Sequence, residues 1–254
     1  MTALIDREDV DGVAVLRLAH GPVNALDLEL LNAITETFTA LDASAHRAIV
    51  LTGSGRAFSA GVDLWRIVEG AADHVGAFLP ALNAAFLAVF SVGKPVVAAV
   101  NGHAIAGGMV LACACDYRVM ADAGGRIGVT ELAVGVPFPL TALEILAFAL
   151  GERGARAAIL AADTCQPPEA LAGGRVDELI TADALIETAI ESARRLARIP
   201  ADTYRLTKAQ LRLPIEERLA RLRPASDPRV HELWVRRIED GGLRRYMEQV
   251  TARR

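Results

Sequence analysis

The 254-residue sequence predicts a mixed α/β fold that continues into a helical region at its C-terminal end. Over the first two-thirds of the chain, short β-branched apolar runs alternate with segments whose apolar residues recur at helical spacing. This alternation is typical of a sheet covered by helices. Hydrophobic residues make up 52% of the chain and charged residues 23%, which is enough for a sizeable core. Because no low-complexity linker precedes the helical region, we expect one folded unit.

The first elements follow from local patterns. Asp27 can cap a helix over residues 28–41, where Leu31, Ile34 and Phe38 recur at helical spacing. β-Branched and apolar runs predict strands before and after this helix, and an Asp-rich turn ending in Gly12 can join the first two as a hairpin. The expected strands are residues 3–5, 13–18 and 48–52.

Two later stretches, Arg56–Leu64 and Val96–Val110, share one organisation. In each, an apolar strand meets a glycine break, a short loop and an apolar continuation, and a helix over residues 71–91 separates the two. Backbone N–H groups near the start of a helix lack partners inside it, so they can bind an oxyanion or a phosphate. Taken alone, tight packing of a helix on a sheet is the simpler explanation.

The rest of the chain adds one or two strands and several helices. Beyond residue 198 the charged, helical pattern is interrupted by prolines, at which we expect the helices to break. The expected strands are residues 116–121 and 176–180, and the expected helices are residues 107–115, 140–150, 152–162, 168–172 and 184–198. The interrupting prolines are Pro200, Pro214, Pro224 and Pro228.

Composition narrows the class of protein. Three cysteines, Cys113, Cys115 and Cys165, are too few and odd in number for a disulfide framework, and no second Cys or His pair suggests a metal site. No apolar run reaches the length of a membrane span, and the acidic N-terminus lacks the apolar core of an export signal. We therefore expect a cytoplasmic protein without a membrane partner.

Charge is unevenly spread along the chain. The net charge is −4, yet from residue 194 onward 16 Lys and Arg residues face 8 Asp and Glu residues. These basic residues are interleaved with apolar and acidic ones at helical spacing. The pattern favours solvated helix faces or subunit contacts over nucleic-acid binding.

Several separated motifs together resemble the crotonase superfamily, the enoyl-CoA hydratases and isomerases. They are Arg56–Leu64, Ala99–Gly108 and Cys115–Arg118, and Gly21–Leu26 is similar to the family's N-terminal loop. The resemblance covers most of residues 10–180. It implies a spiral of repeated ββα units over residues 1–195. It also implies a C-terminal helical region over residues 196–254 that assembles homotrimers, or dimers of trimers.

The resemblance also implies a site for an acyl-CoA thioester, in which coenzyme A is part of the substrate and neither a cofactor nor a metal is needed. The backbone N–H groups of Ala60 and Gly107 would form an oxyanion hole, which stabilises the charge that develops on the thioester oxygen when a neighbouring proton is removed. The implied substrate contacts are Val23, Ala25, Phe58, Ala60, Gly61, Val62, Asp63, Leu64, Gly107 and Gly108.

The acid/base residues distinguish the reactions of this superfamily. Its hydratases place a glutamate at the position of Val110, whereas their second carboxylate matches Glu131. Adding water is easiest when two groups hold and activate it, while moving a double bond from C3–C4 to C2–C3 needs one base. The pattern favours a Δ3,Δ2-enoyl-CoA isomerase with Glu131 as its single acid/base. Residues 135–140 also lack the Pro-Gly-Ala-Gly-Gly-Thr run common in hydratases.

Two alternatives stay open at this point. One is an enoyl-CoA hydratase with a reduced acid set, and the other is a non-catalytic acyl-CoA binding or scaffold protein whose basic end serves a partner. Decarboxylation or hydrolysis of an acyl-CoA is a more distant option.

Other charged and aromatic residues have simpler explanations as well as functional ones. We expect Asp63 to cap a helix and Asp116 to have a structural role at a strand entrance. Arg56 and Lys208 can reach a CoA phosphate or remain solvated. Phe58 can pack near the adenine or in the core.

Overall fold

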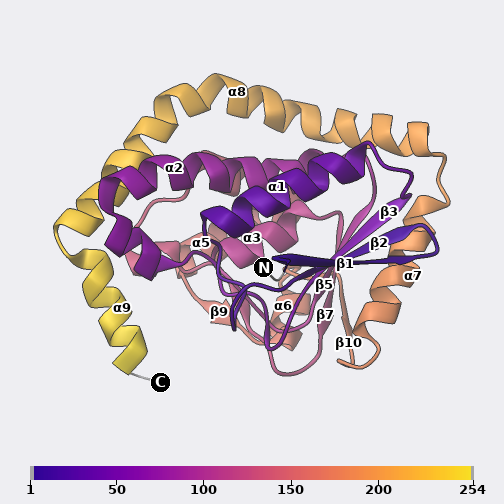
Figure 1. Ribbon diagram of the computed structural model, residues 1–254, viewed down its shortest axis with the longest axis horizontal. Coiled ribbons are helices and arrows are strands. Elements are labelled where there is room, and N and C mark those ends of the chain that lie inside the picture. The colour runs from indigo at the N-terminus through magenta and orange to yellow at the C-terminus, as the bar shows by residue number, and fades with distance from the viewer. Residues whose placement is uncertain (1–2, 253–254) are drawn as a thin grey trace.

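Two sheets of mostly parallel strands form the centre of the protein, whose computed structural model describes residues 3–252 (Figure 1). The larger sheet has the order β1-β2-β3-β5-β7-β10, with strands β1 (Ile5–Val10), β2 (Val13–Leu18), β3 (Ala48–Gly53), β5 (Val96–Val100), β7 (Tyr117–Ala121) and β10 (Glu178–Ile180). The smaller sheet has the order β4-β6-β8-β9, with strands β4 (Ala57–Ser59), β6 (His103–Ile105), β8 (Ile127–Gly128) and β9 (Thr164–Cys165).

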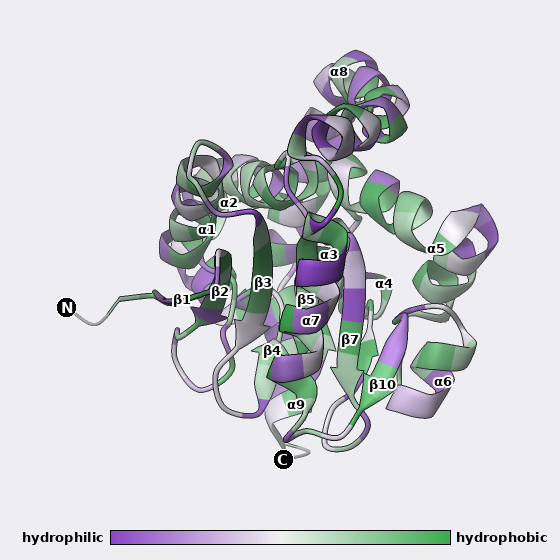
Figure 2. Cartoon of the chain, turned by 90° about the vertical axis from the view of Figure 1, so that its right-hand side faces the viewer, coloured by the Kyte–Doolittle hydropathy of each residue, from purple (hydrophilic) through white to green (hydrophobic). Residues whose placement is uncertain are grey.

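Helices cover both faces of the larger sheet. They are α1 (Leu28–Asp42), α2 (Leu64–Ser91), α3 (Gly107–Ala114), α4 (Glu131–Val134), α5 (Leu140–Ala161), α6 (Pro167–Ala172), α7 (Leu185–Ala197), α8 (Ala201–Glu239) and α9 (Gly242–Ala252). In Figure 2, α7 lies in front of β5, between β3 and β7. Alternate residues of the strands point to opposite faces, so Val50 and Val97 pack under α7 while Leu51 and Ala98 join the main core with α1, α2 and α3.

The chain repeats one path. A strand of the larger sheet leads into a strand of the smaller sheet and then into a helix, as in β3-β4-α2 and β5-β6-α3. The predicted α/β spiral of ββα units, followed by a C-terminal helical region, is confirmed. Because β4, β6 and β8 pair in parallel, their carboxyl ends lie at the same edge of the smaller sheet. Residues that follow these three strands therefore meet.

Element boundaries differ from the predictions near both ends of the first third. The hairpin partner of β2 is β1 over residues 5–10, which pairs antiparallel across the turn at Asp11 and Gly12. Helix α2 begins at Leu64 and not near residue 71, because Asp63 caps it and a kink at Ala71, with φ +52°, joins the two helical parts. The extra turns of α2 place its N-terminus beside the residues after β4.

The prediction that prolines break the C-terminal region was wrong. Helix α8 runs for 39 residues and arches along α2 and α5 (Figure 1). A proline inside a helix costs about 3 kcal/mol because it removes a hydrogen bond and crowds the preceding turn. Packing of one side of α8 against the core outweighs that cost. The buried residues of α8 are Lys208, Arg212, Leu219, Val230 and Trp234, and its internal prolines are Pro214, Pro224 and Pro228.

Helix α2 is, among the described helices, the one that is long and apolar enough to cross a membrane by length and composition. This corrects the expectation that no apolar segment reaches that length. Half of its apolar window is buried within the protein, where α2 packs against α1, α3, α5 and α8. Core helices of this kind pass the same test, so the apolar composition of α2 is explained by its central position.

A buried ion cluster ties α8 to the larger sheet. The carboxylate of Asp116, just before β7, accepts hydrogen bonds from Lys208 Nζ at 2.7 Å, Arg212 Nη2 at 2.6 Å and the Val96 N–H at 2.8 Å. Burial lowers the pKa of Lys208 to about 8. Asp116 therefore has the expected structural role, whereas Lys208 is committed to this cluster and not free to meet a CoA phosphate.

Replacing Asp116 by alanine should be severely destabilising, because it leaves Lys208 and Arg212 buried without their shared counter-ion. We expect a loss of about 3–5 kcal/mol in the free energy of unfolding, measured by urea denaturation. The matched control is Asp227→Ala, which removes a partly exposed ion pair with Arg223 within α8. That change should cost at most about 1 kcal/mol. Equal losses in the two variants would contradict the assigned role of Asp116.

Candidate active site

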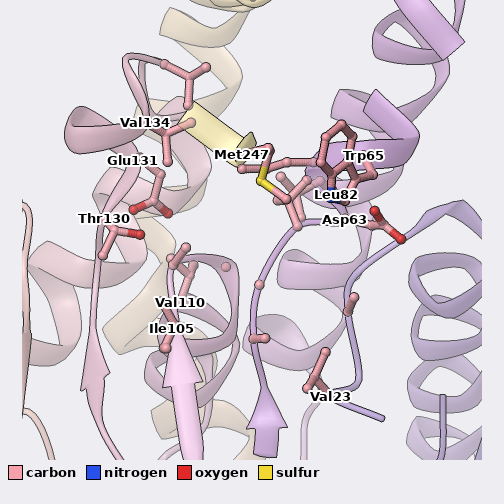
Figure 3. A pocket seen from close by; sticks show the side chains of 18 of the residues that line it. Val23, Asp63, Trp65, Leu82, Ile105, Val110, Thr130, Glu131, Val134 and Met247 are labelled. Atoms are coloured by element: carbon pink, nitrogen blue, oxygen red, sulfur yellow. The ribbon is translucent and has the colours of Figure 1, made fainter. Parts of the chain in front are cut away.

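A largely apolar cavity of about 570 Å³ opens at the edge of the smaller sheet where β4, β6 and β8 end (Figure 3). The segments after these strands supply Ala60 to Leu64, Ala106 and Gly107, and Thr130 and Glu131. Helices close the remaining sides with apolar side chains. These include Leu82 and Phe86 of α2, Val110 of α3, Val134 of α4, Trp234 of α8 and Tyr246, Met247 and Val250 of α9.

One buried side chain fixes the N-terminal wall of this cavity. Asn24 has φ +50° and no solvent exposure, and its amide Nδ2 donates to the carbonyl of Ala57 at 2.9 Å and to that of Phe58 at 3.3 Å. Its Oδ1 accepts from the His20 N–H at 3.0 Å, and its backbone carbonyl accepts from Ser59 Oγ at 2.8 Å. These bonds lock the loop before α1 onto β4, so the loop and Ala60 move as one unit.

Two of the predicted oxyanion donors lie on facing segments of the cavity, but their N–H groups differ in state. Gly107 is the first residue of α3, and its N–H has no acceptor within the helix because it belongs to the first turn. The N–H of Ala60 donates to the carbonyl of Val23 at 3.0 Å. Gly107 thus offers a ready donor, whereas Ala60 must share or exchange its hydrogen bond to bind a ligand oxygen.

The turn into α3 is tightly constrained. Ala106 has φ +52° and ψ −122°, a conformation that residues with a side chain rarely adopt and that is found preferentially at functional sites. A β-carbon at Gly108 would overlap the carbonyl of Ser59, so β4 and α3 can approach this closely only with glycine at that position. The strain and the close approach together aim the first N–H groups of α3 at the cavity.

Glu131 begins α4, directly after β8, and projects into the cavity (Figure 3). Its Oε2 is buried and has no hydrogen-bond partner among residues 3–252. Burial raises the pKa of Glu131 from the ordinary 4.5 to about 7, although backbone N–H groups at residues 130 and 131 offset part of the effect. A carboxyl group with this pKa can accept and return a proton near neutral pH.

The other charged residues near the cavity have structural partners. Asp63 accepts from the Arg66 N–H at 3.1 Å and so caps α2, as expected. Asp27 caps α1 by accepting from the Leu30 N–H at 2.9 Å, and it also pairs with His20 at 2.5 Å and with Arg66 at 2.8 Å. Of the carboxylates that line the cavity in the described part of the chain, Glu131 is the one without such a task.

Most residues selected from the sequence meet at this cavity. Those that line it are Val23, Ala25, Ala60, Gly61, Val62, Asp63, Leu64, Gly107 and Glu131. Phe58 and Gly108 do not. Phe58 is fully buried in the core, and Gly108 packs against β4, so both are packing residues here, contrary to the expected substrate contact. Arg56 is exposed at the turn before β4 and lies outside the lining.

Sequence reasoning missed the helical walls. Leu82 and Phe86 belong to an apolar helix that looks like any core helix, and Trp234 lies far along the chain on α8. Helix α9 did carry a signal, since Leu243, Met247 and Val250 recur at helical spacing. That pattern predicts a buried face but not the cavity against which it lies.

This spiral of ββα units, with helix-start amides and one buried carboxylate at a common edge, has the architecture of crotonase-fold enzymes. A family model described as enoyl-CoA hydratase/isomerase matches residues 8–253. The chain therefore belongs to the enoyl-CoA hydratase/isomerase family of the crotonase superfamily and is an enzyme of that family.

Individual relatives carry both names. The human mitochondrial enoyl-CoA delta isomerase 1 is 31% identical over 225 residues, which cover 87% of this chain and 74% of the human one. A Thermus thermophilus protein that bears the name enoyl-CoA hydratase is 37% identical over 238 residues, covering 89% of this chain and 90% of its own.

Solved structures of relatives also carry both names. The crystal structure of human mitochondrial Δ3-Δ2-enoyl-CoA isomerase superposes with a TM-score of 0.93 at 28% identity and covers 99% of this chain and 100% of that one. An enoyl-CoA hydratase from Mycobacterium ulcerans gives a TM-score of 0.77 at 29% identity and covers 94% and 99%.

Variants of Asn24 should separate its hydrogen bonds from its backbone conformation. Asn24→Gly keeps a residue that tolerates φ +50° but loses the bonds to buried carbonyls, at a cost of about 1–3 kcal/mol in unfolding free energy. Asn24→Ala should cost about 1–2 kcal/mol more, because alanine disfavours the left-handed conformation. Urea denaturation measures both. Equal stability of the glycine and alanine variants would rule out the conformational contribution.

Proposed function

We propose that the protein is a Δ3,Δ2-enoyl-CoA isomerase with Glu131 as its single acid/base. The observation that supports this most directly is the pairing of Glu131 with Val110 across the cavity (Figure 3). Val110 is fully buried in α3 at the position where the family's hydratases carry their other glutamate. The cavity thus combines one unpartnered carboxylate with apolar walls, which suits proton transfer more than activation of water.

The reaction needs one group that moves one proton. Glu131 as carboxylate removes a proton from C2 of a 3-enoyl thioester, and the C–H electron pair spreads over the C1 oxygen and C2–C4 as a dienolate. The protonated Glu131 then delivers a proton to C4. The double bond becomes C2–C3, the thioester carbonyl reforms, and the carboxylate is regenerated. A pKa of about 7 suits both half-steps, because the group exists in both protonation states near neutral pH.

Charge on the thioester oxygen of the dienolate would be held by backbone donors. Gly107 supplies the N–H that has no acceptor within α3. The second donor, Ala60, has to redirect the N–H that it gives to Val23 in the unliganded protein. Losing one donor of this kind typically costs about 100- to 1,000-fold in rate, so this exchange is worth a substantial part of the catalysis.

The second candidate is hydration of 2-enoyl-CoA, which the name of the Thermus thermophilus relative favours. Hydration would leave Glu131 to orient and deprotonate water alone, since Val110 offers no hydrogen bond to it. Loss of absorbance of the conjugated thioester would report hydration, whereas isomerisation of a 3-enoyl-CoA creates that absorbance. A protein that binds acyl-CoA but turns over neither substrate would be the non-catalytic alternative.

We also propose that the protein works in the cytoplasm as a homotrimer or a dimer of trimers, without a cofactor beyond the CoA of its substrate. Large apolar side chains remain exposed on α8 of the isolated chain. They include Leu206, Leu211 and Leu213, which are 61%, 62% and 50% exposed. Their burial against a second copy would remove this surface from water. Light scattering should give a mass of three or six chains, and a monomeric mass would refute the assembly.

Glu131→Gln should lower kcat for 3-enoyl-CoA isomerisation by about 100- to 10,000-fold, because glutamine can neither accept nor deliver the proton. For the parent protein, kcat/KM should fall tenfold per pH unit below about 7 and level off above it, since the ionised carboxylate is the active form. A continuous absorbance assay of the 2-enoyl product measures both. Activity near that of the parent in the glutamine variant would exclude Glu131 as the base.

The stability of the same variant is the control for its folding. The pKa of Glu131 is raised on folding, so the parent loses stability as pH rises from about 4.5 to about 7, whereas glutamine does not titrate. Above pH 7 the variant should therefore unfold at a higher urea concentration than the parent. An inactive and more stable variant assigns the loss of activity to chemistry.

A further inference from the structure

Helix α9 has a single apolar face. Leu243, Tyr246, Met247 and Val250 follow the spacing of one helical stripe, while Glu248 and Gln249 are exposed on the other side. Leu243 is fully buried and anchors the helix in the core. Contacts with α2, α4 and α8 hold α9 across the open side of the cavity (Figure 1). The position of α9 is thus set by packing at its N-terminal end.

The other three residues of this stripe face the cavity and not packed side chains. Tyr246, Met247 and Val250 are half-buried and line the same cavity as Glu131. Figure 3 shows Met247 reaching between the wall that carries Glu131 and the wall that carries Leu82. An amphipathic helix gains most of its stability by burying its apolar face. Here the space in front of that face is open, so an apolar ligand would complete the packing.

The walls around Met247 define the chemistry of that ligand. Leu82 and Phe86 of α2, Val134 of α4 and Trp234 of α8 present hydrocarbon or aromatic surface. The indole N–H of Trp234 is used by the carbonyl of Pro137 at 3.1 Å and does not point a free donor at the cavity. A hydrocarbon chain loses nothing by entering such a space, whereas a hydroxylated or charged chain would leave polar groups unpaired.

We infer that α9 forms the distal wall of the acyl-chain site, that its substrates carry unsubstituted hydrocarbon chains, and that Met247 and Val250 set the longest chain admitted. The inference rests on the proposed function, because it assigns the acyl part of an enoyl-CoA to this cavity. Carbons beyond C4 pass Glu131 and meet the thioether of Met247. Methionine is flexible and fills irregular space, so its replacement by a rigid or a smaller side chain changes the depth of the site.

Selectivity between chain lengths is the direct test. The ratio of kcat/KM for 3-dodecenoyl-CoA to that for 3-hexenoyl-CoA should fall about tenfold or more in Met247→Trp, since a few methylenes in an apolar pocket are worth at least that much. It should rise in Met247→Ala. Val250→Trp is a second narrowing variant at another position, and Gln249→Ala, on the exposed face of α9, is the matched control and should keep the parent's ratio.

A second readout does not require turnover. Hydrogen exchange of residues 242–252 should slow when dodecanoyl-CoA, which has no double bond to move, is added, and should be unchanged by CoA alone. An unaltered selectivity ratio in both tryptophan variants, or equal protection by CoA and dodecanoyl-CoA, would overturn the role of α9. Failure of the parent to isomerise any 3-enoyl-CoA would instead overturn the proposed function, while acyl-dependent protection of α9 would still support the acyl site.

Discussion

The hydrogen bonds of Asn24 are the constraint on which the site depends most. They join the loop before α1 to β4, and β4 is the first of three parallel strands whose carboxyl ends define the cavity. In a parallel arrangement, the position of one strand fixes the level at which the segments after its neighbours emerge. Ala60, Gly107 and Glu131 come from segments more than 20 residues apart, yet they meet because this edge is held in register. A shift of β4 would separate the donors from the carboxylate.

The site also stores unfavourable free energy. Glu131 is buried without a partner, and Ala106 has a positive φ, and each such feature costs on the order of 1–3 kcal/mol. The surrounding structure is rigid enough to sustain both. The core on both faces of the larger sheet and the Asp116 cluster, which fastens α8, lie away from the cavity and contain satisfied interactions. Stability is therefore concentrated in the scaffold, and the reactive groups occupy positions that folding alone would not favour.

Sequence reasoning succeeded where the cause is local and failed where it is tertiary. The cap at Asp27 and the apolar stripe of α1 are visible within one helix, and Gly107 and Glu131 were found because motifs keep them at fixed distances from recognisable strands. Lys208 read as a surface cation, since its partner Asp116 lies 92 residues away. The continuity of α8 through its prolines likewise depends on contacts with α2 and α5. Distant packing of this kind leaves no pattern in a single segment.

Reaction type and substrate size have separate structural origins in this chain. The proton chemistry is proposed to depend on the spiral core, where a change as small as the carboxyl group absent at Val110 alters what Glu131 can do with water. Chain length is proposed to depend on α9, which contributes no reacting group and is attached by Leu243 and by contacts with α2 and α8. Substitutions on the cavity face of α9 leave the register of β4, β6 and β8 untouched. The two properties can therefore vary independently, so relatives that share the core need not share a preferred acyl chain.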